Sequence, residues 1–382
     1  MQRDECGEWL DQVLIERSTD KPSIFSVSSL VVESYMSNYA KDNNRPLLRR
    51  IPYCEDDSGD GTISQSDNGQ FEPLFGICSK KNNTVGLVPS TSITKTSKKN
   101  RKRTNLKISV AYRGLDFCGW EDQRHELYRN SNISSSNITD NAEQPLPSVQ
   151  GTLADILGPA IGNSANTKPI EIKVAGRTDR GVSAIGQVCR VRTWKVIPDV
   201  ETYVQDLVNR EANDSNLGLR ITNVQQAGQD FHPSFGASSR SYVYLIDLED
   251  SNDDDDLPRI TRNLVPRLDR MLRELEGKEL DYFALSHGKV KTETTLCTLH
   301  HCKASIVEYI GGGDHKRQAL CFELVGNRFL RRMVRLLVGT ALREAYRAGG
   351  DDALLHILSS KDRRERSRAA PPDGLIFVRA ET

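Results

Sequence analysis

The sequence predicts an α+β protein, because segments with the two-residue alternation of strands are mixed with segments of helical spacing. At 382 residues the chain is long enough for two domains or for one large domain. An acidic loop at 249–257 divides the periodic part of the chain, so we expect two halves on either side of it.

The first 104 residues are predicted to form an N-terminal extension that is partly disordered. They are rich in Ser, Asn, Asp and Lys and contain few periodic apolar segments. Glu8–Ile15 and Phe71–Val88 are the two pieces expected to be ordered. The basic run at 98–103 is compatible with phosphate contacts, with a nuclear address and with a solvated charge run.

The first half is predicted to span residues 105–248. Ser148 is expected to cap a helix that continues to Leu157, and the polar segment 124–147 before it is expected to be an inserted loop. The remaining elements predicted here are strands at 106–111, 170–175, 187–193 and around Tyr242, and a helix near 200–210.

The second half is predicted to span residues 257–382. It contains helical patterns at 261–276, 328–346 and 352–358, and strand patterns near 295–309 and 318–325. In the long helix the spacing places Arg328, Arg331, Arg332, Arg335 and Arg343 on one stripe, together with Gly339. Like charges at this spacing repel one another, so the stripe needs a counter-anion or a solvated surface.

The loop Ala175–Val182 joins two predicted strands and presents one carboxylate, Asp179, between Arg177 and Arg180. Glycines in such a loop permit backbone angles that other residues avoid. Neighbouring arginines favour the ionised carboxylate, which suits a nucleophile better than a general acid. The spacing alone is more typical of an ordinary surface ion pair.

Composition narrows the class of protein. Lys+Arg and Asp+Glu are equal at 52 each, but acids and bases cluster separately, so a neutral total is compatible with a polarised surface. Eight cysteines without Cys-x-x-Cys pairs fit reduced thiols in an intracellular protein. No apolar run reaches the length of a membrane span, and we expect no membrane association.

Two weaker metal motifs carry little weight. The acidic segment 56–67 has the spacing of a calcium loop, but prolines and a glycine beside it argue against flanking helices. Cys297, His300, His301 and Cys302 contain zinc-ligand types, but strand alternation points neighbouring side chains apart. We therefore predict no metal site.

Five segments in order resemble the TruA family of tRNA pseudouridine synthases, in its eukaryotic form. They cover residues 106–378 and leave the first 104 outside the resemblance. The matching segments are the loop Ala175–Val182, the opening Tyr112–Trp120, the segment from Phe231 that ends in the Arg-x-Tyr-x-Tyr strand at Arg240–Tyr244, the Met-Val-Arg segment at 327–335, and the closing Ala370–Leu375.

The resemblance implies a pseudouridine-synthase fold, with two mainly antiparallel sheet-plus-helix halves and an RNA cleft between them. It implies an isomerase that converts uridine to pseudouridine in tRNA, around positions 38–40 of the anticodon arm, and a homodimer. The reaction is redox-neutral and needs no external group, so no cofactor is expected. The expected location is cytoplasmic or nuclear.

The resemblance also assigns roles to site residues. Asp179 corresponds to the nucleophile, and Arg335 to the arginine that pairs with it. Tyr242 corresponds to a tyrosine that stacks on the extruded base, although a core tyrosine fits the strand pattern as well. Arg177 matches an arginine that supports the flipped-out state, and Arg240 is expected to bind phosphate or to support its strand.

Three positions depart from the family pattern, namely Ser183, Ser234 and Glu121, and none of them removes a proposed catalytic group. The alternatives are an enzyme of the same class that acts on another RNA, and an RNA-binding protein that folds tRNA without modifying it.

Overall fold

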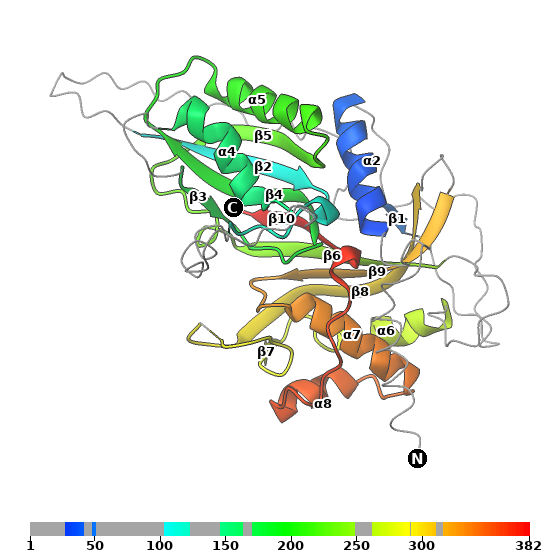
Figure 1. Ribbon diagram of the computed structural model, residues 1–382. Coiled ribbons are helices and arrows are strands. Elements are labelled where there is room, and N and C mark those ends of the chain that lie inside the picture. Colours follow the sequence, from blue (N-terminus) through cyan, green and yellow to red (C-terminus); the bar gives the residue numbers. More distant parts are fainter. Residues whose placement is uncertain are drawn as a thin grey trace, which may run out of the picture.

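The computed structural model describes residues 27–41, 48–50, 103–122, 146–162, 170–248, 262–290, 292–310 and 316–382. The predicted pieces at 8–15 and 71–88, the calcium-like segment, the acidic loop and almost all of the 124–147 insertion and the basic run lie outside these residues. The α+β class is confirmed, because helices pack on a large mixed sheet (Figure 1).

A single sheet of ten strands runs through the described residues, in the order β1-β8-β9-β6-β10-β4-β2-β5, with β3 paired to β4 and β7 paired to β8. The strands are β1 (Leu48–Arg50), β2 (Thr104–Tyr112), β3 (Ile172–Val174), β4 (Ser183–Thr193), β5 (Leu219–Ala227), β6 (Ser239–Asp247), β7 (Glu279–Asp281), β8 (Leu296–Ile310), β9 (Lys316–Gly326) and β10 (Leu375–Glu381). The pairings are antiparallel except that of β10 with β4, which is parallel. The expected two sheets are therefore joined into one, and β10 is the strand that joins them.

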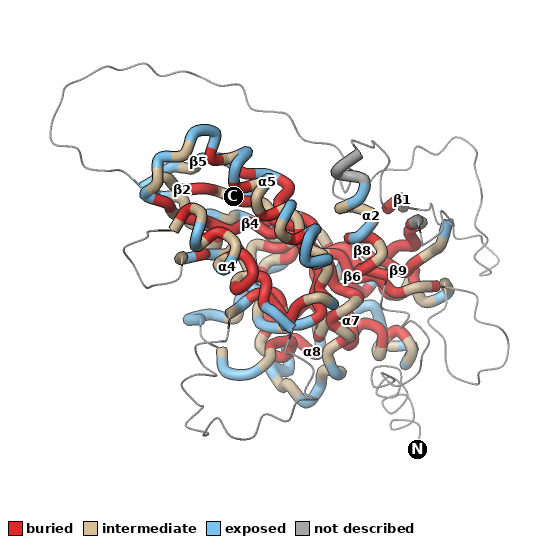
Figure 2. Tube along the Cα trace, turned by 45° about the horizontal axis from the view of Figure 1, so that its top comes forward, coloured by how far each residue is buried: buried red, intermediate tan, exposed pale blue. Residues whose placement is uncertain are grey.

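Five helices cover one face of this sheet in two groups (Figures 1 and 2). The first group is α4 (Val149–Ile161) and α5 (Val200–Asp214), which pack on β2, β4 and β5. The second is α6 (Val265–Arg273), α7 (Met333–Tyr346) and α8 (Ala353–Ser360), which pack on β6, β8 and β9. Short 3-10 turns lie at Gly114–Asp116, Arg262–Leu264 and Pro372–Gly374.

The alternation of β10 shows that both groups lie on the same face. Phe377 belongs to the core under α4 and α5, and Leu375 to the core under α6 to α8, whereas Ile376 and Val378 face a third core. Successive side chains of a strand point to opposite faces, so the first two cores share one face. Tyr242 of β6 packs against both, which places the boundary between the groups beside this residue.

The opposite face is covered by α2 (Val27–Lys41), a helix that the sequence patterns did not predict. Its buried Val27, Val31 and Val32 pack against outward-facing residues of β4, β6, β8 and β10. The short strand β1 extends the sheet edge beside β8. The first 104 residues therefore supply part of the packed structure.

Local signals located most other elements correctly. Ser148 caps α4 as predicted, because its side-chain oxygen accepts a hydrogen bond from the backbone N–H of Gly151 at 3.0 Å. The strands β5, β7 and β10 had not been assigned from the sequence. The long helix was predicted to begin at Arg328, but α7 begins at Met333.

Candidate active site

The Asp179 loop connects β3 to β4, as the alternation predicted, and it is braced by the segment that follows β2. The backbone N–H of Trp120 donates to the carbonyl of Thr178 at 3.1 Å. Gly119 has a φ of +119°, and a Cβ on it would lie 3.1 Å from the Thr178 carbonyl oxygen, so only glycine fits this contact without strain. The Thr178 hydroxyl also lies 2.7 Å from the buried Tyr112 hydroxyl.

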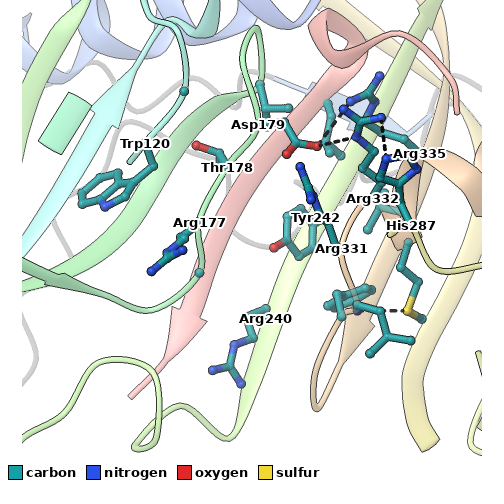
Figure 3. Close-up of a pocket in the computed structure, with 18 of the residues that line it drawn as sticks. Trp120, Arg177, Thr178, Asp179, Arg240, Tyr242, His287, Arg331, Arg332 and Arg335 are labelled. Carbon is teal, nitrogen blue, oxygen red and sulfur yellow. Dashed lines mark hydrogen bonds and ion pairs between the residues drawn. The ribbon is translucent and has the colours of Figure 1, made fainter. Parts of the chain in front are cut away.

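The carboxylate of Asp179 is one third exposed and is held by two arginines from the α7 region (Figure 3). Its Oδ2 lies 3.4 Å from Nη1 of Arg335 and 3.6 Å from Nε of Arg332. These contacts join residues more than 150 positions apart, and they place opposite charge directly against the carboxylate.

The arginines next to Asp179 in sequence do not have this role, contrary to the prediction from the loop. Arg177 turns away and forms an ion pair with Glu121 at 2.7 Å, both side chains being well exposed. Arg180 is exposed at the rim of the cleft. Glu121, one of the departures from the family pattern, is thus the partner of Arg177.

The predicted arginine stripe is also wrong in part. Residues 327–332 form a loop, and Arg332 has a left-handed φ of +59°, so Arg328, Arg331 and Arg332 are not on the helix. A left-handed residue without glycine's freedom costs about 1–3 kcal/mol, and such strain is maintained only by surrounding contacts. Gly339 does allow a close approach, because a Cβ there would lie 2.4 Å from the Arg368 carbonyl oxygen.

Arg335 is nearly buried, with 12% of its side chain exposed. Its Nε donates to the carbonyl of Ala370 at 2.6 Å, and the Ala370 N–H donates to the Arg335 carbonyl at 3.0 Å. Burial lowers the pKa of Arg335, and the charge of Asp179 acts in the opposite direction. The guanidinium is therefore fixed in place beside Asp179 by the segment that leads into β10.

Tyr242 lies on β6 beside the loop, with its ring between two other rings. It makes edge contacts with Phe329 and Phe377, at centroid distances of 4.8 and 5.1 Å. Burial raises the pKa of Tyr242, and the Asp179 charge adds to this shift, so the side chain remains a neutral phenol at physiological pH.

Arg240, on the same strand, bonds to the backbone. Its Nη1 donates to the carbonyls of Ala237 and Asn327 at 3.0 and 2.8 Å, and its Nη2 to those of Ser234 and Ala175 at 2.6 and 3.4 Å. These four bonds tie three loops at the cleft to β6.

His287 is a site residue that the sequence did not single out. Its Nε2 accepts from Nη1 of Arg332 at 3.4 Å, and its backbone N–H donates to the Arg331 carbonyl at 3.1 Å. Burial lowers the pKa of His287, and Arg332, Arg331 and Arg366 lower it further. The imidazole is thus neutral at pH 7 and carries its proton on Nδ1 when it accepts from Arg332.

A cleft of about 760 Å³ contains these groups. It is lined by the Asp179 loop, the start of β6, the segment around His287 and residues 328–335. The predicted site residues Asp179, Tyr242, Arg177, Arg335 and Arg240 all line it. Within the described ranges, His, Cys, Asp and Glu side chains form no cluster suited to a metal ion. None of the helices described has the length and apolar character needed to cross a bilayer.

Comparisons with known proteins find similar sequences among tRNA pseudouridine synthases. The family model described as tRNA pseudouridine synthase matches residues 271–381. The protein named tRNA pseudouridine synthase A of Chloroflexus aurantiacus is 32% identical over 281 residues, which cover 72% of this chain and 87% of the relative. Its namesakes in Hydrogenovibrio crunogenus and Leptospira biflexa are 29% and 28% identical, and the alignments cover 92% and 93% of those proteins.

Among solved structures, a Cas6 product complex shares 13% identity with a TM-score of 0.14, which is too low to inform the fold. The extent and identity of the sequence matches decide the assignment: this chain belongs to the TruA family of tRNA pseudouridine synthases.

Proposed function

We propose that the protein isomerises uridine to pseudouridine in tRNA and that Asp179 is the nucleophile. The observation that supports this most directly is a carboxylate held by Arg332 and Arg335 and still one third exposed to a cleft. A carboxylate that faces open space can reach a substrate, whereas a purely structural ion pair gains nothing from this exposure. The relatives in the family carry the name of this activity.

The reaction needs few groups from the protein. The bond between ribose C1′ and N1 of uracil breaks, the base turns, and a bond from C1′ to C5 forms. C5 then loses a proton and N1 gains one, so atoms and electrons balance without a cofactor. Attack on C1′, attack on C6 and an assisted glycal route all use the same carboxylate.

The neighbouring residues have separate roles in this proposal. Arg335 orients the carboxylate of Asp179. Tyr242 stacks on the extruded base and presents a neutral hydroxyl near C5. Arg177, which is exposed at the cleft, supports the flipped-out state from the RNA side. Arg240 acts mainly by tying the loops together, because four of its N–H groups are already bonded to carbonyls, which leaves its Nε–H for a phosphate.

The substrate RNA would lie in the cleft between the two sheet-plus-helix halves, and the target uridine would leave its stack to reach Asp179. We place the target in the anticodon arm, at about positions 38–40, on the family resemblance. Recognition of A-form RNA by shape, by a homodimer in the cytoplasm or nucleus, completes the proposal.

The test is release of tritium from tRNA that carries uridine labelled at C5. Wild-type protein should release label, and Asp179→Ala should release none while binding tRNA with unchanged affinity. Asp179→Ala that still turns over would exclude Asp179 as nucleophile. Tritium release from other RNAs but not from tRNA would assign the enzyme a different RNA substrate. Folded wild-type protein that binds tRNA without releasing tritium would favour the RNA-binding alternative that folds tRNA without modifying it.

A further inference from the structure

The N-terminal segment is attached to the back of the sheet at two places. Val27, Val31 and Val32 of α2 are at most 2% exposed and pack over β4, β6 and β10. At the other end, Leu48 of β1 is fully buried, and Arg50 makes two bonds of 2.8 and 2.9 Å to the buried carboxylate of Glu323. Helix α2 therefore lies on the face of the sheet opposite helices α4 to α8, and β1 is an edge strand of the same sheet (Figure 1).

One contact from α2 leads towards Asp179 through the turn before β10. Ser28 is completely buried, and its hydroxyl donates to the carbonyl of Asp373. The preceding residue, Pro372, packs directly against Gly181 of the Asp179 loop, where a Cβ would lie 3.0 Å from the proline Cγ. Gly181 has a φ of +81°, so the loop reverses direction at this contact.

The same turn also supports the arginine that pairs with Asp179. Ala370 bonds to Arg335 through both its N–H and its carbonyl, and the carbonyl of Pro371 accepts from the Tyr244 hydroxyl at 2.9 Å. Residues 370–373 thus lie between α2 on one side and Arg335 on the other. A shift of this turn would move both members of the Asp179–Arg335 pair.

A second chain of contacts from α2 towards the Asp179 loop begins at Glu33. Its carboxylate lies 3.6 Å from Nη1 of Arg113. The next residue, Gly114, donates from its N–H to the Ser183 hydroxyl at 2.9 Å and packs so closely on Gly181 that a Cβ would lie 2.3 Å from its carbonyl oxygen. Both routes from α2 therefore end at Gly181–Ser183, which begins two residues after Asp179.

We propose that α2 is a positioning element of the active site, and that Ser28 is the residue through which it fixes the Asp179 loop. This inference rests on the proposed function of Asp179. Ser28 touches neither substrate nor reacting atoms. It acts by holding the 370–373 turn, and through it Gly181 and Arg335, in the arrangement that the reaction requires.

Ser28→Ala in the full chain tests this, with Ser29→Ala as the matched control. Ser29 is the adjacent residue on α2, is 7% exposed, and its hydroxyl has no hydrogen-bond partner among the described residues. Both variants remove one buried hydroxyl from the same helix. The measurements are the single-turnover rate of tritium release, tRNA affinity, thermal midpoint and amide exchange of Val182, whose N–H bonds to the Asp179 carbonyl at 3.2 Å.

Ser28→Ala should lower the single-turnover rate by about tenfold or more, because small displacements of a reacting group reduce rates steeply. It should also speed exchange at Val182, with tRNA affinity unchanged. Ser29→Ala should leave the rate and the Val182 exchange at wild-type values.

Equal rates for the two variants, or faster Val182 exchange in both, would overturn the proposal. If Ser28→Ala fails to fold, Glu33→Gln on the exposed second route replaces it. This variant should lose less of the single-turnover rate and should also speed Val182 exchange. A rate and an exchange that both match the wild type would again overturn the proposal. Inactive wild type would instead contradict the proposed function.

Discussion

Replacing Arg335 by methionine separates the positioning of Asp179 from stability in general. The variant loses a charged hydrogen bond to the Ala370 carbonyl and an ion pair with Asp179 at 3.4 Å. The first contributes about 1.5–3 kcal/mol and the second, which is partly exposed, up to about 1 kcal/mol. We expect the free energy of unfolding to fall by about 2–4 kcal/mol.

Arg343→Met is the matched control on the same helix. Arg343 is also 12% exposed, and it too pairs with a carboxylate, Glu344, at 2.7 Å and donates to a carbonyl, that of Glu365. The two variants should therefore lose similar stability in urea unfolding.

Only Arg335→Met should lose catalysis, by about 100-fold in single-turnover tritium release, because a misplaced reacting group costs about that much per ångström. Single-turnover rates within threefold of each other for the two variants would refute the role given to Arg335.

Three further perturbations follow from the structure. Arg50→Met should destabilise the fold by about 3–5 kcal/mol in urea unfolding, because it leaves the Glu323 carboxylate buried without its main partner. Arg50→Met combined with Glu323→Leu should recover most of the lost stability. An unchanged stability of the single variant would contradict this. Because the pKa of His287 is depressed in the folded protein, the unfolded state takes up the proton first as the pH falls. The stability of the fold should therefore decrease as the pH drops below about 6.5. In His287→Gln the thermal midpoint should decrease less between pH 7 and 5.5 than it does in the wild type. Phe235 is 88% exposed and lies next to the cleft residue Ser234, so its ring should stack on RNA. Phe235→Ala should therefore weaken tRNA binding by about 1–3 kcal/mol and leave the single-turnover rate unchanged. An unchanged affinity would exclude the contact.

The parts of the fold that the sequence predicted correctly depend on local signals. Alternation located the strands on both sides of the Asp179 loop, and the side chain of Ser148 marks the start of α4. A cap or a two-residue period acts between neighbours in sequence, so no knowledge of the rest of the molecule is needed.

The wrong and missing predictions depend on tertiary contacts. The helical spacing continues back to Arg328, but Phe329 packs on the Tyr242 ring and Arg332 turns left-handed to reach Asp179, so α7 begins later. Val27, Val31 and Val32 have helical spacing too, but β-branched residues favour helices weakly, and only their burial against the sheet stabilises α2.

Among the site residues too, those marked by local sequence could be predicted, and those brought in by tertiary contacts could not. Asp179 was found from its loop, whereas its partner Arg332 and the nearby His287 come from distant parts of the chain. The flanking Arg177 had been expected to stabilise the carboxylate, but successive side chains in a loop diverge, and Arg177 pairs with Glu121. Sequence adjacency is a weak guide to electrostatic partners.

The place of β10 in the sheet has a consequence for synthesis of the protein. This strand, residues 375–381, pairs with β6 on one side and β4 on the other, and it follows every other described strand in sequence. On the ribosome both groups of strands emerge before the strand that joins them, and their edges remain unpaired until then. The sheet that supports both sides of the Asp179–Arg335 pair is therefore completed only after residues 375–381 have left the ribosome.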